Sequence, residues 1–176
     1  MPPRPRPVPT LRPSKVLPPG GGETLHVLDE LATFKVTAGD GQGAFSLVEL
    51  DCPPGGGVPV HAHTVADHML YVLAGTFAVT LDGRRDTLTP GACAVIPRGH
   101  AHGYANVGDE RGRLLVMASP PASEERVFLE LASMLATGPG GSTELTSAIR
   151  LLGARHDLSL PIAEEPPPDP PPAPPS

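Results

Sequence analysis

Apolar and polar residues alternate in short runs between residues 32 and 119, and turn residues separate the runs. A period of two places successive side chains on opposite faces of a β-strand. The runs predict strands at 32–38, 44–50, 58–63, 68–75, 76–81, 92–97, 102–107 and 113–119. Gly- and Pro-containing or charged turns are predicted at 39–43, 53–57, 82–86, 89–91 and 108–112. Many short, closely spaced strands predict an all-β sandwich or barrel instead of alternating β and α units.

The pattern changes after residue 121, where apolar residues recur at helical spacing in two stretches, 122–136 and 142–156. Ser123 is available as the N-cap of the first predicted helix. The apolar positions are Val127, Phe128, Leu131, Met134 and Leu135 in the first stretch and Leu145, Ile149 and Leu152 in the second. We expect these helices to cover an open face or edge of the β body, with a dimer arm or a lid as the alternative.

Proline is concentrated at the two ends of the chain. Residues 1–21 hold eight of the 25 prolines and residues 161–176 hold nine. Such segments have too few apolar side chains to offset the entropy lost on ordering. We therefore expect disordered Pro-rich tails at 1–21 and 161–176 around one folded domain at 22–160.

The remaining composition excludes several classes of protein. The net charge is −6 and the basic residues outside the N-terminal tail are scattered, so we expect no nucleic-acid partner. No apolar run approaches the length of a membrane span, and prolines interrupt any secretory signal, so we expect no membrane association. Cys52 and Cys93 form no CxxC pair and are expected as free thiols of a cytoplasmic protein, with Cys93 a small buried hydrophobe.

Three of the seven histidines lie in the stretch HAHTVADH. Residues two apart on a strand share a face, so His61 and His63 point the same way. His68 opens the next predicted strand, and His100 and His102 lie at the start of a later one. Converging imidazoles suit a first-row transition metal such as Fe, Mn, Ni, Cu or Zn, whereas Mg or Ca would prefer carboxylates.

The spacing around these histidines resembles the two cupin motifs. GGGVPVHAHTVADHMLYVLAG is similar to G-x5-H-x-H-x3/4-E-x6-G, and GACAVIPRGHAHGYAN is similar to G-x5-P-x-G-x2-H-x3-N at every position. The matching positions are Gly55, His61, His63, His68 and Gly75, then Gly91, Pro97, Gly99, His102 and Asn106. The chain thus resembles the cupin superfamily, and within it the small single-domain cupins of the quercetin 2,3-dioxygenase-like type.

The resemblance implies a double-stranded β-helix, the cupin jelly-roll barrel, here with two short C-terminal helices. It also implies one divalent transition metal ion in the barrel and, commonly, a homodimer. His61, His63 and His102 carry over as metal ligands, and His68 stands in the glutamate position as a substituted fourth ligand. Asp67 is the alternative fourth ligand, because the shorter form of the motif would place the ligand there. We favour His68, since Asp67 has the opposite strand parity and the wrong distance to Gly75.

Replacing the glutamate by histidine changes the expected chemistry. An ion held by neutral imidazoles alone keeps its full charge, which favours anionic substrate groups and disfavours oxidation of the metal. In the flavonol dioxygenases that the family includes, the glutamate is thought to help deprotonate the substrate. Its absence here counts against a flavonol substrate.

We expect a metal-dependent dioxygenase acting on a small organic substrate of the enolate or phenolate type. A non-oxidative isomerase, lyase or decarboxylase at the same ion and a non-catalytic small-molecule-binding cupin remain open as alternatives. Tyr104, on the same strand face as His102, is the one candidate catalytic side chain, and an ordinary buried tyrosine is its alternative role. Glu49 is a candidate to orient a ligand imidazole. His100 and His156 are expected at the surface.

Overall fold

The structure is a computed structural model, and it describes residues 14–27, 30–121, 124–135, 142–153, 155–156 and 159. Within these residues the chain forms ten strands and two helices. The strands are β1 (Glu23–Val27), β2 (Glu30–Val36), β3 (Ser46–Cys52), β4 (Gly57–His61), β5 (Asp67–Ala74), β6 (Phe77–Leu81), β7 (Arg84–Leu88), β8 (Cys93–Ile96), β9 (His102–Asn106) and β10 (Gly112–Ser119). The helices are α1 (Glu124–Leu135) and α2 (Ser142–Gly153).

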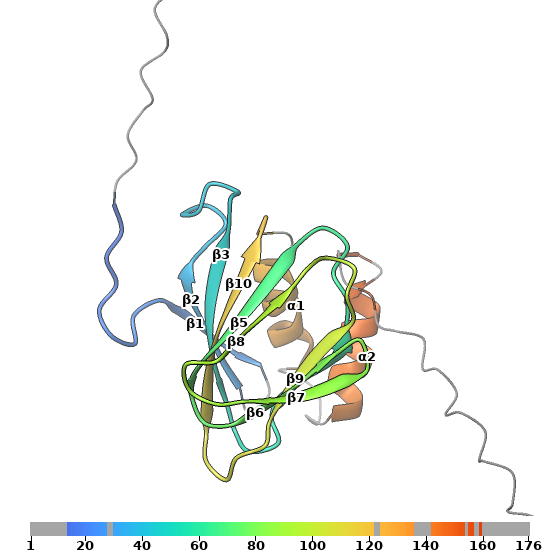
Figure 1. Cartoon of the computed structure of the whole chain (residues 1–176). Helices are drawn as coiled ribbons and strands as arrows, with labels where there is room; N and C mark the ends of the chain where they lie inside the picture. The colour runs from blue at the N-terminus through green and yellow to red at the C-terminus, as the bar shows by residue number, and fades with distance from the viewer. Residues whose placement is uncertain are drawn as a thin grey trace, which may run out of the picture.

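The strands form two antiparallel sheets, which Figure 1 shows wrapped into one β body. The larger sheet has the order β1-β2-β3-β10-β5-β8, and the smaller has the order β4-β9-β6-β7. Most neighbours are distant in sequence, so strands from the two histidine-bearing motifs meet: β4 pairs with β9, with His61 opposite His102. The predicted all-β barrel of the double-stranded β-helix type, with two small helices, is confirmed.

Alternate residues of the strands form the core between the sheets. Every second side chain of β3 is buried, and β5 buries His68, Leu70 and Val72 on one face. The largest fully buried side chains include Phe77, Leu50, Leu70, Ile96 and Leu114. A shift of one residue in β5 would turn its whole apolar set outward, so this packing also fixes the direction of His68.

Two strands were not expected from the sequence, β1 and β7. The predicted turn at 82–86 is wrong beyond residue 83, because the chain reverses at Asp82 and Gly83 and then pairs as β7 with β6. Both turn residues have positive φ, 47° and 81°, as a tight hairpin turn requires. β1 and β7 are edge strands with mostly exposed or half-exposed side chains, so neither carries an alternating apolar pattern.

Cys93 is exposed, and the expectation that it is a buried hydrophobe is wrong. It begins β8, at the edge of the larger sheet, and it lies opposite the exposed Tyr71 of β5. An apolar run of four residues has side chains on both faces, and only Ile96 of β8 is buried. Cys52, by contrast, is buried at the end of β3.

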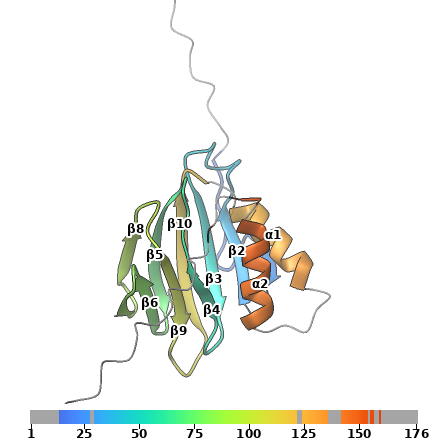
Figure 2. The same ribbon diagram turned by 90° about the vertical axis from the view of Figure 1, so that its right-hand side faces the viewer.

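The two helices pack on the β body, on the side of β1 and β2 and away from β8 (Figure 2). A second apolar cluster joins them to β1 through Val27, Val127, Leu131, Ala148 and Leu152. Val58 of β4 and Phe128 of α1 are packed against this cluster. These contacts confirm the expected covering role of the helices. The predicted N-cap, Ser123, lies outside the described residues.

The described part of the N-terminal tail, from residue 14, lies against the turn after β2. The Lys15 ammonium lies 2.5 Å from the Asp40 carboxylate, and Lys35 donates to the Gly21 carbonyl at 3.0 Å. Residues 161–176 lie outside the described part of the chain, and the predicted tail boundaries stay predictions. No described helix is long and apolar enough to cross a membrane. The homodimer stays a prediction as well.

Candidate metal centre

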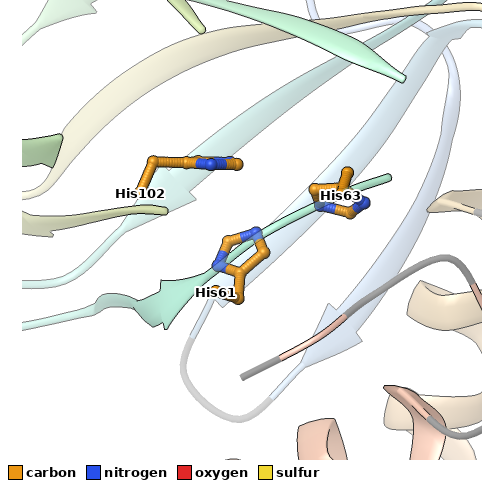
Figure 3. A group of neighbouring side chains, drawn as sticks. All are labelled: His61, His63 and His102. Carbon is orange, nitrogen blue, oxygen red and sulfur yellow. The ribbon is translucent and has the colours of Figure 1, made fainter. Parts of the chain in front are cut away.

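Three histidines of the two motifs come together inside the barrel (Figure 3). One ligand nitrogen from each of His61, His63 and His102 lies within 4.8 Å of those of the other two. The side chains are buried, at 6%, 6% and 4% exposure. His61 ends β4 opposite the start of β9, which carries His102, and His63 follows two residues later. Strand pairing therefore assembles the three residues that the sequence spacing had singled out.

Backbone carbonyls orient two of the rings. His61 Nδ1 lies 2.9 Å from the Pro59 carbonyl oxygen, and His102 Nδ1 lies 3.0 Å from the His100 carbonyl oxygen. A carbonyl only accepts, so each Nδ1 carries the proton and each Nε2 has a free lone pair. A metal-binding histidine is commonly held in this way by an outer hydrogen bond.

The electrostatics of the cluster keep the His61 and His102 imidazoles neutral. Burial, with a smaller contribution from the neighbouring His102, lowers the pKa of His61 to about 3. The pKa of His102 is lowered as well, chiefly by burial. Neutral imidazole is the form that binds a metal. Three buried, converging imidazole donors, of which His61 and His102 are held neutral, therefore fit a transition metal ion, as the sequence predicted.

His68, the predicted fourth ligand, lies beside this trio. It is 6% exposed, and its ring centroid is 4.2 Å from that of His63 and 5.4 Å from that of His102. It is not among the three residues whose ligand atoms lie within 4.8 Å of one another. His68 as a metal ligand stays a prediction.

Asp67, the alternative fourth ligand, is engaged by Arg98. The Arg98 side chain donates from Nε to Oδ1 and from Nη2 to Oδ2, each at 3.0 Å, and its backbone N–H donates to Oδ1 at 2.9 Å. These hydrogen bonds lower the pKa of Asp67 to about 2. The carboxylate is about half exposed, whereas His68 is buried on the other face of β5. This placement favours His68 over Asp67.

The segment that carries His102 into place is tied down at several points. The Gly99 N–H donates to the His63 carbonyl at 2.7 Å, which joins the two motifs directly. Asp82 accepts from the Ala101 N–H at 3.0 Å and lies 2.5 Å from His100 Nδ1. His100 is about half exposed, as expected. Sequence reasoning missed Asp82, whose only signal was its place in an Asp-Gly turn.

A second group of titratable side chains lies at the other end of the barrel. His68 is in register with Ala118 and Ser46, and Cys52 is six residues further along β3. At that end the Glu30 carboxylate is hydrogen-bonded to the Cys52 thiol and to the backbone of Gly57. Burial raises the pKa of Glu30 to about 7 and raises the pKa of Cys52 far above its usual value.

The two other polar candidates have contacts away from the histidines. Burial, with Glu30 and Cys52 nearby, raises the pKa of Tyr104 well above its usual value, and Tyr104 packs edge-on against Phe77. Its catalytic role stays a prediction, and these contacts favour a structural one. Glu49, a candidate to orient an imidazole, instead forms ion pairs with Lys35 at 3.0 Å and Arg113 at 3.4 Å.

Comparisons with known proteins agree with this fold and this centre. Residues 48–118, which contain both histidine motifs, match the family described as "Cupin domain". The structure of KdgF from Halomonas sp. is similar with a TM-score of 0.56 at 20% identity, over 61% of this chain and 94% of that one. The polyketide cyclase RemF from Streptomyces resistomycificus is 28% identical with a TM-score of 0.54, over 60% of this chain and 79% of that one.

Among curated proteins, "Polyketide synthase CurC" from Streptomyces cyaneus is 33% identical over 87 residues, which is 49% of this chain and 55% of that protein. The chain spans about half the length of the first curated relatives it matches. Together these findings support the cupin superfamily, with a centre in which three histidines are placed to bind a metal ion. The finer resemblance to quercetin 2,3-dioxygenase-like cupins stays a prediction.

Proposed function

We propose that the protein is a metal-dependent enzyme that acts on a small enolisable molecule of the polyketide type, by ring closure without an oxidant. The observation that carries this proposal is the trio of buried imidazoles whose donor atoms lie within 4.8 Å of one another. The similarity to a polyketide cyclase at 28% identity and to a polyketide synthase protein at 33% identity supports the substrate class.

The chain's own residues have defined tasks in this proposal. His61, His63 and His102 would hold the ion, with the Pro59 and His100 carbonyls fixing two of the rings. A bound divalent ion supplies positive charge that stabilises negative charge developing on a substrate oxygen. No carboxylate belongs to the cluster that converges within 4.8 Å among the described residues, so that charge is not neutralised by the protein.

The surroundings of the cluster suit an apolar substrate that ionises readily. Leu70 and Ile96 are buried beside His68, on its own strand and on the paired strand, and they limit the access of water. The cluster offers no carboxylate as a general base, which favours a substrate as acidic as a 1,3-dicarbonyl. In an intramolecular aldol closure the enolate carbon bonds to a carbonyl carbon, the proton returns to that oxygen, and one water then leaves.

The dioxygenase predicted from the sequence is the second candidate. It uses the same residues, and a set of imidazole donors suits redox-active Fe, Mn, Ni or Cu as well as Zn. In that case O2 would be consumed and the substrate would gain oxygen. A third outcome, a cupin that binds a small molecule without turnover, shares the fold but not the chemistry.

Product analysis separates the three candidates. The protein is loaded separately with Zn²⁺, Fe²⁺, Mn²⁺, Ni²⁺ and Cu²⁺ and incubated, in air and without O2, with linear poly-β-ketones as substrates for ring closure and with 1,3-diketones as substrates for the dioxygenase. We expect a product lighter by one water, formed equally well without O2. Uptake of O2 and an oxygenated product would establish the dioxygenase, and metal binding without turnover on any substrate would contradict both enzymes. His63→Ala should abolish turnover, whereas His26→Ala, at an exposed position on β1, should not.

A further inference from the structure

The strand that carries the first metal-binding histidines lies at a sheet edge. β4 is the terminal strand of the smaller sheet and pairs only with β9 there. The last residue of β4 is His61, and Ala62 separates it from His63. An edge segment has backbone groups with no partner strand and opens more easily than the sheet interior.

Ser159, far along the chain, occupies this edge. The Ala62 N–H donates to the Ser159 carbonyl at 2.7 Å, and the Ser159 N–H donates to the Ala62 carbonyl at 2.8 Å. The two residues form an isolated antiparallel bridge. The residue held in this way is the one between two of the three metal-binding candidates.

The turn after α2 is itself fixed to the body. His156 Nε2 lies 2.9 Å from a carboxylate oxygen of Glu130 on α1, and the N–H groups of Arg155 and His156 donate to the Leu152 carbonyl at 2.8 and 2.9 Å. The His156 side chain is only 10% exposed, so its expected surface position is wrong. Leu152 is fully buried in the cluster against which Val58 of β4 is packed.

β4 is therefore contacted at two places: at Val58 by the apolar cluster of the two helices, and just beyond its end, at Ala62, by Ser159 through two backbone hydrogen bonds. We propose that α1, α2 and Ser159 form a brace that positions His61 and His63 for metal binding. Ser159 and Leu152 are thus positioning residues. This inference rests on the proposed function only in requiring that the three histidines bind a metal ion.

The physical reason for the effect is preorganisation. Ligands that must be ordered when the ion arrives bind it more weakly than ligands already held in place. The bridge fixes both the N–H and the C=O of Ala62, and so limits rotation of the backbone between the two imidazoles. Loss of an outer contact that orients a ligand commonly lowers metal affinity by about 10- to 100-fold.

The test uses the full chain and the pair Ser159→Pro and Ser159→Ala. Proline removes the N–H donor and clashes with the Ala62 carbonyl, whereas alanine keeps both backbone hydrogen bonds and loses only a hydroxyl contact at 3.4 Å. Two quantities are measured: hydrogen exchange of the Ala62 amide in metal-free protein, and Co²⁺ affinity by competition with a chromophoric chelator. We expect Ser159→Pro to speed Ala62 exchange and weaken Co²⁺ binding by about tenfold or more, with Ser159→Ala like the unchanged chain.

Each other outcome is decisive. Faster Ala62 exchange with unchanged Co²⁺ affinity would show a bridge that does not position the ligands, and unchanged exchange would show no bridge; both overturn the brace. Equal weakening by Ser159→Ala would also overturn it. Failure of the unchanged chain to bind Co²⁺ would instead contradict the proposed function. Leu152→Ala, with the exposed Leu151→Ala as its control, should weaken Co²⁺ binding in the same direction from the helical side.

Discussion

The two ends of the barrel both bury titratable side chains, and they do so with opposite results. At one end His61, His63 and His102 present lone pairs to a common point. At the other end Glu30 is hydrogen-bonded to the Cys52 thiol, near Tyr104. Burial favours the neutral form of His61 and His102 at the first end and of Glu30, Cys52 and Tyr104 at the other, because it lowers the pKa of an imidazole and raises that of a carboxyl, thiol or phenol.

The difference lies in what the neutral groups offer. The His61 and His102 rings use their N–H groups on backbone carbonyls, so their remaining nitrogens can only accept. Glu30 receives a hydrogen bond from Gly57 and pairs with Cys52, so that end satisfies its own polar groups. One end therefore offers acceptors to a cation, whereas the polar groups of the Glu30–Cys52 end are paired with one another.

The largest expected effect is at the histidine end. His63→Ala removes one of three donors and should lower metal affinity by more than about 100-fold, beyond what the loss of an outer contact costs. Competition with a chromophoric chelator measures the change, and His26→Ala is the matched control at an exposed site. If His63→Ala bound the metal as tightly as wild type, the claim that the histidine end is the metal-binding end would be contradicted.

The next largest effect is at the Glu30–Cys52 end of the barrel and depends on pH. The pKa of Glu30 is raised to about 7 in the fold from 4.5, so the folded chain holds its proton more tightly than the unfolded chain. The contribution of Glu30 to stability is therefore full below about pH 4.5, falls as the pH rises to about 7, and is constant above that.

Glu30→Gln should remove this loss of stability at higher pH, because glutamine does not ionise. At each pH the free energy of unfolding of the variant is compared with that of wild type. We expect this difference to favour the variant by about 1–3 kcal/mol more at pH 8 than at pH 4.5. Urea unfolding at the two pH values measures it. An equal difference between the proteins at both pH values would show that Glu30 is not held in its neutral form.

A smaller effect distinguishes His68 from Asp67. His68→Ala should weaken metal binding by about tenfold, since the buried ring lies beside His63, while Asp67→Ala should leave the metal content unchanged. Elemental analysis and chelator competition on both variants give the answer. Metal loss in Asp67→Ala with retention in His68→Ala would assign the fourth position to the carboxylate.

The smallest effect is expected for Tyr104→Phe. Loss of the Tyr104 hydroxyl should lower the free energy of unfolding by about 1 kcal/mol and leave turnover unchanged. A catalytic proton donor would instead lower turnover by about 100-fold or more. Steady-state rates with the cyclisation substrates decide between the structural and the catalytic role.

Local pattern was sufficient to predict most of the barrel. Alternation located the central strands, and spacing singled out His61, His63 and His102 before any pairing was known. The same alternation failed at the sheet edges, where β1 and β7 are too exposed to carry an apolar face. It also misplaced Cys93, because a short apolar run does not tell which face is buried.

Contacts between distant segments were beyond the reach of the sequence. The Arg98 hydrogen bonds to Asp67, the Asp82 contacts with residues 100–101 and the Ser159 bridge to Ala62 each join segments that meet only after folding. None has a periodic or motif signal, since each depends on strand order and on the path of a turn. These contacts orient the site, whereas the motifs specify its ligands.

X-ray absorption spectroscopy of the protein reconstituted with one equivalent of Zn²⁺ tests the central claim most directly. The account predicts one tightly bound ion with at least three imidazole nitrogen ligands, and the loss of one imidazole in His63→Ala. A spectrum dominated by oxygen or sulfur ligands, or the absence of a tightly bound ion, would contradict it.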